Sequence, residues 1–274
     1  MADIVLTAGV RSNLLQLQKT TELITSTQTK LATGKRVNSA LDNPVNFFTA
    51  AGLSNRASDL SNLLDSMSTA FNTIQAANNG ISSITKLVQS AQALASQAQQ
   101  TSDTTIRASL ATQFAAIQTQ IDQLAGDSGF NGINLLDSSN SSNLAVTLNE
   151  SGSSSVTITA VDFTSAGDLG INNAANNWAT AADITAASTD LTAALTTLRS
   201  QAQAFGSNLS TVQIRQDFTK AMVNTLQTGA DALTLADSNE EGANLLALQT
   251  RQQLSTTALS LASQASQAVL RLFQ

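Results

Sequence analysis

The sequence contains no histidine and no cysteine among its 274 residues. Without cysteine there is no disulfide framework, no thiol nucleophile and no thiolate zinc site. Without histidine there is no Ser-His-Asp triad, no imidazole proton shuttle and no histidine-ligated metal centre. We therefore expect no enzyme activity and no catalytic, cofactor-binding or metal site.

Aromatic and charged residues are also scarce. Aromatics make up 4% of the chain, tyrosine is absent, and charged residues make up 12%, about half the ~25% of an average soluble domain. So few aromatics leave little bulk for a deep globular core. The net charge of −6, with scattered Lys and Arg, argues against nucleic-acid binding. The sequence has no run of 18 consecutive apolar residues, so no membrane-spanning segment is predicted.

The amino-terminal sequence, MADIVLTAGVRSNLLQLQ, has no basic segment before an apolar run and no small-residue cleavage pattern. A cleaved secretory signal is therefore not expected. Residence in the cytosol and export by a route without a cleaved signal both fit this sequence.

Apolar residues repeat every 3.5 residues in five stretches, a pattern typical of helices that pack as coiled coils. The fourth stretch, residues 184–233, would span on the order of 75 Å as one helix. Such a helix cannot hide its apolar face in a compact domain, so the pattern predicts a rod. The first and last stretches, which we expect to form self-assembly seams, place apolar residues at Leu14, Leu17, Ile24, Leu31, Leu254, Leu261 and Leu272.

The period falls to two residues in the middle of the chain. Segments 144–148 and 156–160 alternate apolar and polar residues, and the turn-forming residues 149–153 separate them. This pattern predicts a β-hairpin. The following residues are rich in Gly, Asn and Ala, and Trp178 is expected to cover the junction between this small tip and the rod.

The predicted fold is mainly α: an elongated antiparallel coiled-coil or helical-bundle rod with a small β-hairpin tip. Its amino- and carboxy-terminal helices pair at one end, and their exposed apolar stripes require partner subunits. We expect residues 1–45 to form the first helix and a loop, 46–137 the first rod helices, 138–180 the hairpin and tip, 181–235 the long return helix, and 236–274 the last helix.

Three local features near the helix ends can be interpreted from their residues. Residues 35–46 read as loop because Pro44 lacks an N–H donor and restricts Asn43. Phe47 and Phe48 are interpreted as packing anchors for that loop rather than a ligand site. The acidic group 237–241 suggests a cation site, but Ser238 followed by Glu241 is better read as a capping box.

Five motifs in order resemble the bacterial flagellin family. Residues 31–43, LATGKRVNSALDN, are similar to the family's LSSGxRINSAxDD signature, and residues 129–137, GFNGINLLD, to its FNGxxLL turn. DLGI at 168–171 is similar to the LGL stretch after the family's hairpin. ADSNEEGANL at 236–245 and QASQAVLRLF at 264–273 are similar to the carboxy-terminal signature.

This resemblance implies an extracellular filament subunit of the bacterial flagellum, exported unfolded with an uncleaved amino-terminal region. It implies self-polymerisation beneath a cap, with terminal helices in an inner tube and central helices in the outer wall. The implied partners are other copies of the chain, the export apparatus and its chaperone, the filament cap and the hook-junction proteins. The variable mid-chain insertion is small, which implies a slim, smooth filament.

Alternatives at this stage concern the role of the chain and of one loop. A hook–filament junction protein shares the terminal helices, whereas a coiled-coil adhesin would need a larger tip than residues 138–180. Lys35 and Arg36 fit a solvated loop and a subunit-contact loop equally well.

One departure from the family concerns receptor recognition. Flagellins detected by the flagellin-sensing Toll-like receptor carry an LQRxRELAVQ motif, where this chain has LVQSAQALAS at 87–96. Ser90 and Gln92 stand where the arginines would be, and Ala93 replaces the glutamate. Because arginine's bidentate and stacking contacts are lost, we expect weak or no recognition by this receptor.

Overall fold

The computed structural model describes residues 8–138 and 143–272, which divide into two compact units. Unit 1 comprises the described residues up to Asn55 and from Thr225 onward, and unit 2 comprises Arg56–Asn224. Helices dominate both units, and the described strands form one two-stranded antiparallel sheet. The mainly α fold with a small β-hairpin is therefore confirmed. In the described part of the chain, no helix is long and apolar enough to cross a membrane.

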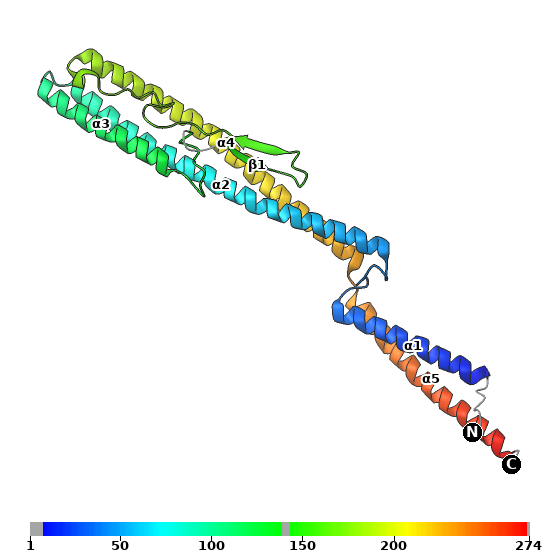
Figure 1. Cartoon of the computed structure of the whole chain (residues 1–274). Helices are drawn as coiled ribbons and strands as arrows, with labels where there is room; N and C mark the ends of the chain where they lie inside the picture. Colours follow the sequence, from blue (N-terminus) through cyan, green and yellow to red (C-terminus); the bar gives the residue numbers. More distant parts are fainter. Residues whose placement is uncertain (1–7, 139–142, 273–274) are drawn as a thin grey trace. The chain divides into compact units, whose positions relative to one another are not determined.

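Unit 1 is built on two paired helices, α1 (Ala8–Thr33) and α5 (Ser238–Leu272). They lie side by side (Figure 1). Lys30 bonds to Glu241 near one end, and Gln252 lies 3.4 Å from the Thr21 hydroxyl further along. Because partner numbers rise on one helix as they fall on the other, the two helices are antiparallel, and the predicted pairing of the terminal helices is confirmed.

The loop between α1 and α2 (Pro44–Gln99) is shorter than expected. Helix α1 ends at Thr33, and Gly34 follows with a φ of 67°, the left-handed conformation that favours glycine after a helix. The prediction of loop through Asn46 is wrong, since α2 begins at Pro44. Asn43 caps it, accepting from the Asn46 N–H at 3.0 Å. Proline is tolerated at the first helical position because that N–H has no partner in the helix anyway.

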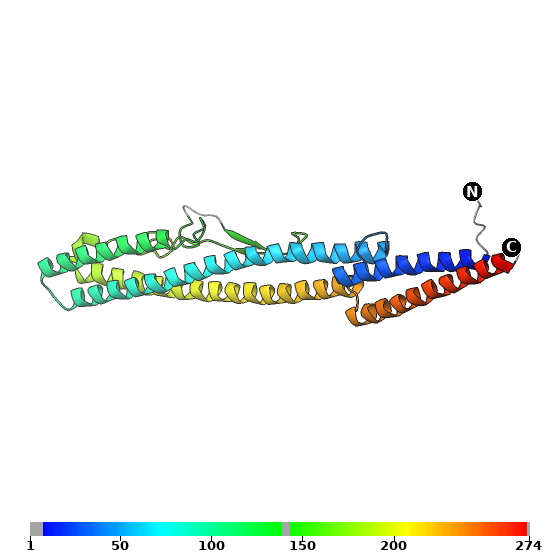
Figure 2. The same ribbon diagram turned by 90° about the horizontal axis from the view of Figure 1, so that it is seen from below.

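Unit 2 is a helical bundle covered by irregular chain. Helix α3 (Thr104–Asp127) lies along α2, and α4 (Ala181–Thr234) lies beside both (Figures 1 and 2). The Asp103 carboxylate caps α3 by accepting from the N–H groups of Thr105 and Ile106. Thr180 and Asp183 form a reciprocal capping box at the start of α4, because the backbone N–H of each donates to the side chain of the other. These caps locate the helix boundaries within the bundle.

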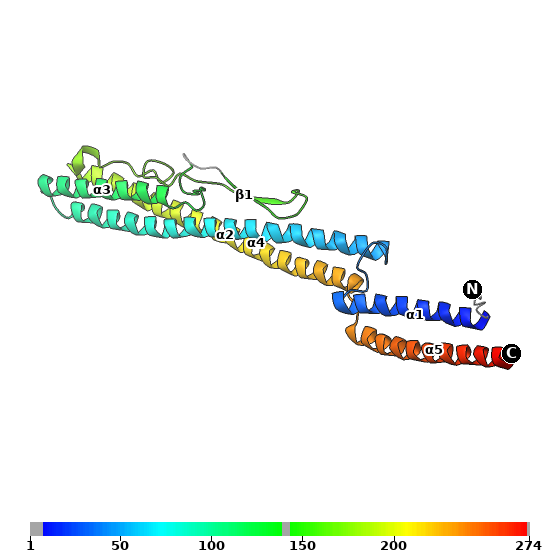
Figure 3. The same ribbon diagram turned by 60° about the horizontal axis from the view of Figure 1, so that its bottom comes forward.

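The hairpin comprises β1 (Leu144–Thr147) and β2 (Ser155–Ile158), in the register Leu144 opposite Ile158. It lies over α2 (Figure 3), with which it lines a shared groove. Arg56 of α2 forms an ion pair with Glu150 in the hairpin turn. The predicted hairpin is therefore present and is attached to α2 at its turn.

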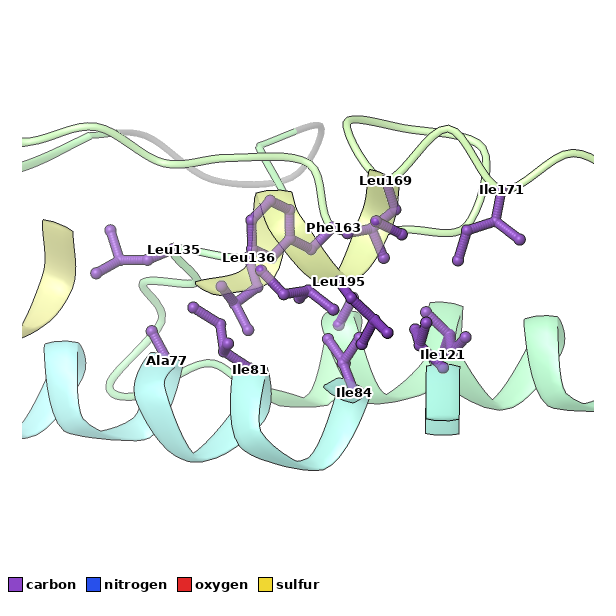
Figure 4. Packing of buried hydrophobic residues seen from close by; sticks show 14 of the residues in the cluster. Ala77, Ile81, Ile84, Ile121, Leu135, Leu136, Phe163, Leu169, Ile171 and Leu195 are labelled. Carbon is purple, nitrogen blue, oxygen red and sulfur yellow. The ribbon is translucent and has the colours of Figure 1, made fainter. Parts of the chain in front are cut away.

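The continuous buried cluster lies wholly within unit 2. Figure 4 shows how its side chains converge from the helices and from the chain between α3 and α4. Labelled members include Ile81 and Ile84 from α2, Ile121 from α3 and Leu195 from α4, with Phe163 packed over them. Unit 2 thus supplies its own apolar core.

Trp178 is fully buried and its ring lies 5.0 Å from that of Phe114. It ends a short turn, η1 (Ala175–Trp178), in which Asn176, Asn177 and Trp178 all have positive φ. Such a run is rare for residues other than glycine. The burial of the indole against α3 offsets this strain, and Trp178 serves as a core aromatic of unit 2.

Candidate assembly surface

The contact between α1 and α5 follows a heptad spacing on both helices. On α5 the buried or half-buried side chains alternate at intervals of four and three: Glu241, Leu245, Leu248, Gln252, Ser255, Leu259 and Ala262. On α1 the corresponding positions are Leu17, Thr20, Ile24, Thr27 and Leu31. We call these two sets the inner stripe, since they face each other within one chain.

Of the α1 residues predicted to form a self-assembly seam, Leu17, Ile24 and Leu31 lie on the inner stripe and so face α5 of the same chain, and a role for them between subunits stays a prediction. Leu14 is exposed, and Thr20 and Thr27 take the intervening inner positions. The Thr20 hydroxyl donates to the Gln16 carbonyl at 2.8 Å, so its burial leaves no unpaired hydroxyl. Two threonines therefore belong to a stripe that apolar spacing alone does not reveal.

A second heptad set on α5 lies to one side of the contact with α1. Leu254, Ala258, Leu261 and Ala265 are all exposed, and we call them the outer stripe. Leu254 is 66% exposed and Leu261 is 61% exposed. At 3.6 residues per turn this stripe is centred roughly 100° around the helix from the inner stripe. Leu272 lies within α5, but its side chain is outside the described residues.

A shallow groove of about 550 Å³ runs between α1 and α5 on this side. Its walls include the exposed Leu23 and Leu254 and the Arg251 side chain. The Lys30 ammonium lies 2.9 Å from the Glu241 carboxylate within the same groove. The surface thus combines apolar side chains with charged groups, as protein–protein interfaces do.

The start of α5 differs from the predicted capping box. Asp237 is the cap: its carboxylate accepts from the N–H groups of Asn239 and Glu240. Ser238 is the first helical residue, and Glu241 reaches α1 rather than its own helix start. Aspartate caps as well as serine does, which leaves Glu241 available to hold Lys30 of α1.

Lys35 and Arg36 lie where the chain after α1 pairs with the end of α4. Lys35 bridges Leu235, and the Arg36 N–H donates to the Thr234 carbonyl at 2.8 Å. The Arg36 guanidinium donates to the Ala232 carbonyl at 3.1 Å, where the helix C-terminus favours a cation. Both residues are exposed, and Arg36 is already engaged within its own chain.

The two phenylalanines after Pro44 differ in burial. Phe47 is half-buried, whereas Phe48 is exposed, and their rings meet edge to face at 5.5 Å. The interpretation of both as packing anchors is therefore wrong for Phe48. In a helix, neighbouring residues point in directions about 100° apart. Phe47 therefore points toward the loop, where it lines a groove with Val37, whereas Phe48 points to another side.

Comparison with known proteins identifies both ends of the chain. The model of the bacterial flagellin N-terminal helical region matches residues 7–141, and that of the C-terminal helical region matches residues 171–273. The chain belongs to the bacterial flagellin family. The matched regions contain α1 to α3 at one end and α4 and α5 at the other, including both helices of the inner stripe.

Several flagellins are similar to the chain. Flagellin FljM of Caulobacter vibrioides is 31% identical over 165 residues, which are 60% of this chain and 59% of that protein. Flagellin A of Rhizobium meliloti is 42% identical over 79 residues, 29% of this chain and 20% of that protein. The matches thus span less than two thirds of either relative. A crystal structure of Bacillus cereus flagellin matches at 23% identity and a TM-score of 0.48, covering 58% of this chain and 88% of that one.

The segment that departs from receptor-detected flagellins lies on α2. Ser90 and Ala93 are exposed there, and Gln92 is half-buried. Ser90 donates its hydroxyl to the Lys86 carbonyl at 3.0 Å. This flagellin-family chain therefore carries uncharged side chains at all three positions.

Proposed function

We propose that this chain is a structural subunit that is exported and self-polymerises into the bacterial flagellar filament, the helical propeller for swimming. The observation that carries the proposal is the exposed outer stripe of α5, which lies within the matched flagellin C-terminal region. Its apolar side chains sit on the helix pair formed by the two chain ends. They require cover that α1 does not provide.

The energetics favour burial between subunits. Burying a leucine side chain contributes about 1.5–3 kcal/mol, and Leu254 and Leu261 are both more than half exposed. Leu246 on α5 and Leu15 and Leu23 on α1 are also exposed. A few kcal/mol at each such contact, repeated at every neighbour, favours a polymer in which many contacts act together.

Leu261→Asp tests this surface directly. We expect the variant to be exported normally but to block filament growth, because a carboxylate on the outer stripe becomes buried without a partner. Ser263→Asp is the matched control, since Ser263 is exposed on the opposite side of α5 from the outer stripe. Electron microscopy of cells and assay of shed protein separate export from assembly. Long filaments at normal yield from Leu261→Asp would refute the proposal.

The filament role itself is tested with purified protein. Mild acid should release monomers, and neutral solution with short filament seeds should regrow helical filaments visible by electron microscopy. A filament subunit elongates without limit on such seeds, whereas a hook–filament junction protein stops after a short segment. Failure to elongate beyond a junction-sized segment would contradict the assignment.

We also propose that the protein is located outside the cell without removal of an amino-terminal signal. Membership of the bacterial flagellin family supports a place in the extracellular filament. The export apparatus, its chaperone, the filament cap and the hook-junction proteins are the proposed partners beyond the chain itself. Mass spectrometry of protein from sheared filaments should find the amino-terminal sequence intact, and a shortened chain would contradict this route.

Weak recognition by the flagellin-sensing Toll-like receptor is proposed from residues 90–93. Ser90, Gln92 and Ala93 offer no guanidinium or carboxylate for ion pairing. Reporter cells carrying the receptor should respond at least tenfold more weakly than to a flagellin with the arginines. An equal response at equal monomer concentration would exclude the idea.

A further inference from the structure

Asparagine is followed directly by glycine at two places in the chain, Asn79–Gly80 and Asn131–Gly132. This dipeptide is reactive because glycine has no side chain to shield its backbone nitrogen. That nitrogen can attack the side-chain amide carbon of the preceding asparagine and close a five-membered imide ring. Since both sites have the same chemistry, a difference in their reactivity must come from the structure around them.

Asn131 and Gly132 form an exposed turn after α3. The Phe130 N–H donates to the Ile133 carbonyl at 2.8 Å, and the Ile133 N–H donates to the Phe130 carbonyl at 3.0 Å. Asn131 has a φ of 50° and Gly132 a φ of 80°, as a type I′ turn requires. Both residues are exposed, and within the described part of the chain neither the Asn131 side chain nor the Gly132 N–H makes a hydrogen bond. The turn is therefore held closed by the two bonds between Phe130 and Ile133.

Asn79 and Gly80 lie in the interior of α2 and are held more firmly. Each N–H in a helix interior donates to the carbonyl four residues earlier, and Gly80 is buried against Ser128 and Leu136. Rotating this peptide to form the imide would break the helix and the packing around it. Local opening costs little free energy in exposed segments and approaches the full free energy of unfolding in a core. The same reaction is therefore hindered at Asn79 and accessible at Asn131.

We propose that Asn131 is a site of spontaneous deamidation in the folded protein, whereas Asn79 is protected by α2. The Gly132 nitrogen forms a bond to Cγ of Asn131 and loses its proton to solvent, and the side-chain amide nitrogen leaves as ammonia. Water then hydrolyses one of the two imide carbonyls, which gives aspartate or isoaspartate. Water is the co-reactant, and the net change is from an amide to a carboxylate. This inference is independent of the proposed filament function.

The two products change the turn in different ways. Aspartate adds a negative charge but keeps the main chain, and it tolerates a left-handed conformation. Isoaspartate adds the same charge and also inserts a methylene group into the main chain, which moves Phe130 and Ile133 out of register. Ile133 packs against the buried cluster of unit 2, and Leu135 and Leu136 are fully buried in it. Isoaspartate should therefore loosen the attachment of this segment to the core.

Mass spectrometry of the aged full chain tests the proposal. Purified protein is held at mildly alkaline pH, where the attacking nitrogen is deprotonated more often, and is then digested with an acid protease. Conversion of amide to acid is followed in the fragments that contain each site. In the folded chain we expect Asn131 to convert about tenfold faster than Asn79 or more, because its local opening costs less free energy. In urea, where both sites are unfolded, the two rates should agree within about threefold. Equal rates in the folded chain, or a difference that persists unchanged in urea, would overturn the proposal.

Gly132→Asn tests the chemistry while preserving the turn. Asparagine adopts positive φ more readily than most residues, but its side chain shields the backbone nitrogen that glycine leaves open. Conversion of Asn131 should slow severalfold both in the folded chain and in urea. An unchanged rate would overturn the assigned attack by the Gly132 nitrogen.

Asn131→Asp separates the added charge from the added methylene group. The isoaspartate fraction of the aged chain should show faster backbone hydrogen exchange at Leu135 and Leu136 than this variant does. Exchange no faster than in Asn131→Asp would overturn the inferred loosening of the segment.

Discussion

Replacing Gly80 with alanine should destabilise unit 2, although alanine is the better helix former. Gly80 is a buried residue in the interior of α2. A Cβ atom there would lie 2.2 Å from the Ser128 hydroxyl oxygen, 2.8 Å from the Ser128 Cβ and 2.6 Å from a Leu136 methyl carbon. The glycine therefore permits the chain after α3 to approach the α2 backbone.

Two opposing contributions to the free energy of unfolding decide the effect of Gly80→Ala: helix propensity and overpacking. Alanine gains about 0.8–1.0 kcal/mol over glycine in a helix interior. Against this, overpacking a tight core costs about 1–3 kcal/mol. Moving Ser128 also strains its 2.6 Å hydrogen bond to the Leu124 carbonyl, worth about 1 kcal/mol. The balance predicts a net loss of about 1–3 kcal/mol for Gly80→Ala.

Gly206→Ala is the matched control. Gly206 also lies inside a helix of unit 2, but a Cβ there meets no atom within 4 Å. It should therefore stabilise the chain by up to about 1 kcal/mol. Thermal unfolding of the monomer, followed by circular dichroism, should show Tm falling by roughly 3–10 °C for Gly80→Ala and rising by roughly 2–4 °C for Gly206→Ala. Equal stabilisation by both substitutions would refute the packing argument.

Two further predictions concern ion pairs. Lys30→Met should destabilise unit 1 by about 1–2 kcal/mol, because it leaves the mostly buried Glu241 carboxylate without its cation. Backbone hydrogen exchange in α1 should then become faster, and unchanged exchange would contradict this prediction. The pKa of the Glu150 carboxyl is lowered below 4.5, first by a backbone N–H and then by Arg56. The ionised carboxylate therefore stabilises the folded state fully above pH 4.5, and this contribution is lost as the pH falls through the lowered pKa. Arg56→Gln should therefore reduce the extra stability of unit 2 at neutral pH relative to acid, as measured by urea unfolding at pH 3 and 7, whereas an unchanged pH dependence would exclude this pair as a contributor.

The helices, the hairpin and the family were predictable because each depends on local patterns. Apolar spacing identifies α4 and α5, and the two-residue alternation identifies the hairpin. The ion pairs were not predictable, since Lys30 and Glu241 are separated by 211 positions and Arg56 and Glu150 by 94. The set of α1 residues that face α5 was only partly predictable, because Thr20 is a polar residue whose hydroxyl donates to a carbonyl of its own helix. The sequence shows that a threonine is polar but not that its hydroxyl can donate to its own helix and so be buried.

The distribution of large and small side chains on α5 explains where assembly energy resides. The contact with α1 combines leucines that are only half-buried with small or polar side chains such as Ser255 and Ala262, whereas Leu254 and Leu261 are exposed. Small and polar side chains permit close approach of two helices but bury little apolar area, so the pair gains only modest stability on its own. The exposed Leu254 and Leu261 contribute their hydrophobic free energy only when another surface covers them. A terminal unit arranged in this way is weakly stabilised as a monomer and becomes strongly ordered by the contacts of a polymer.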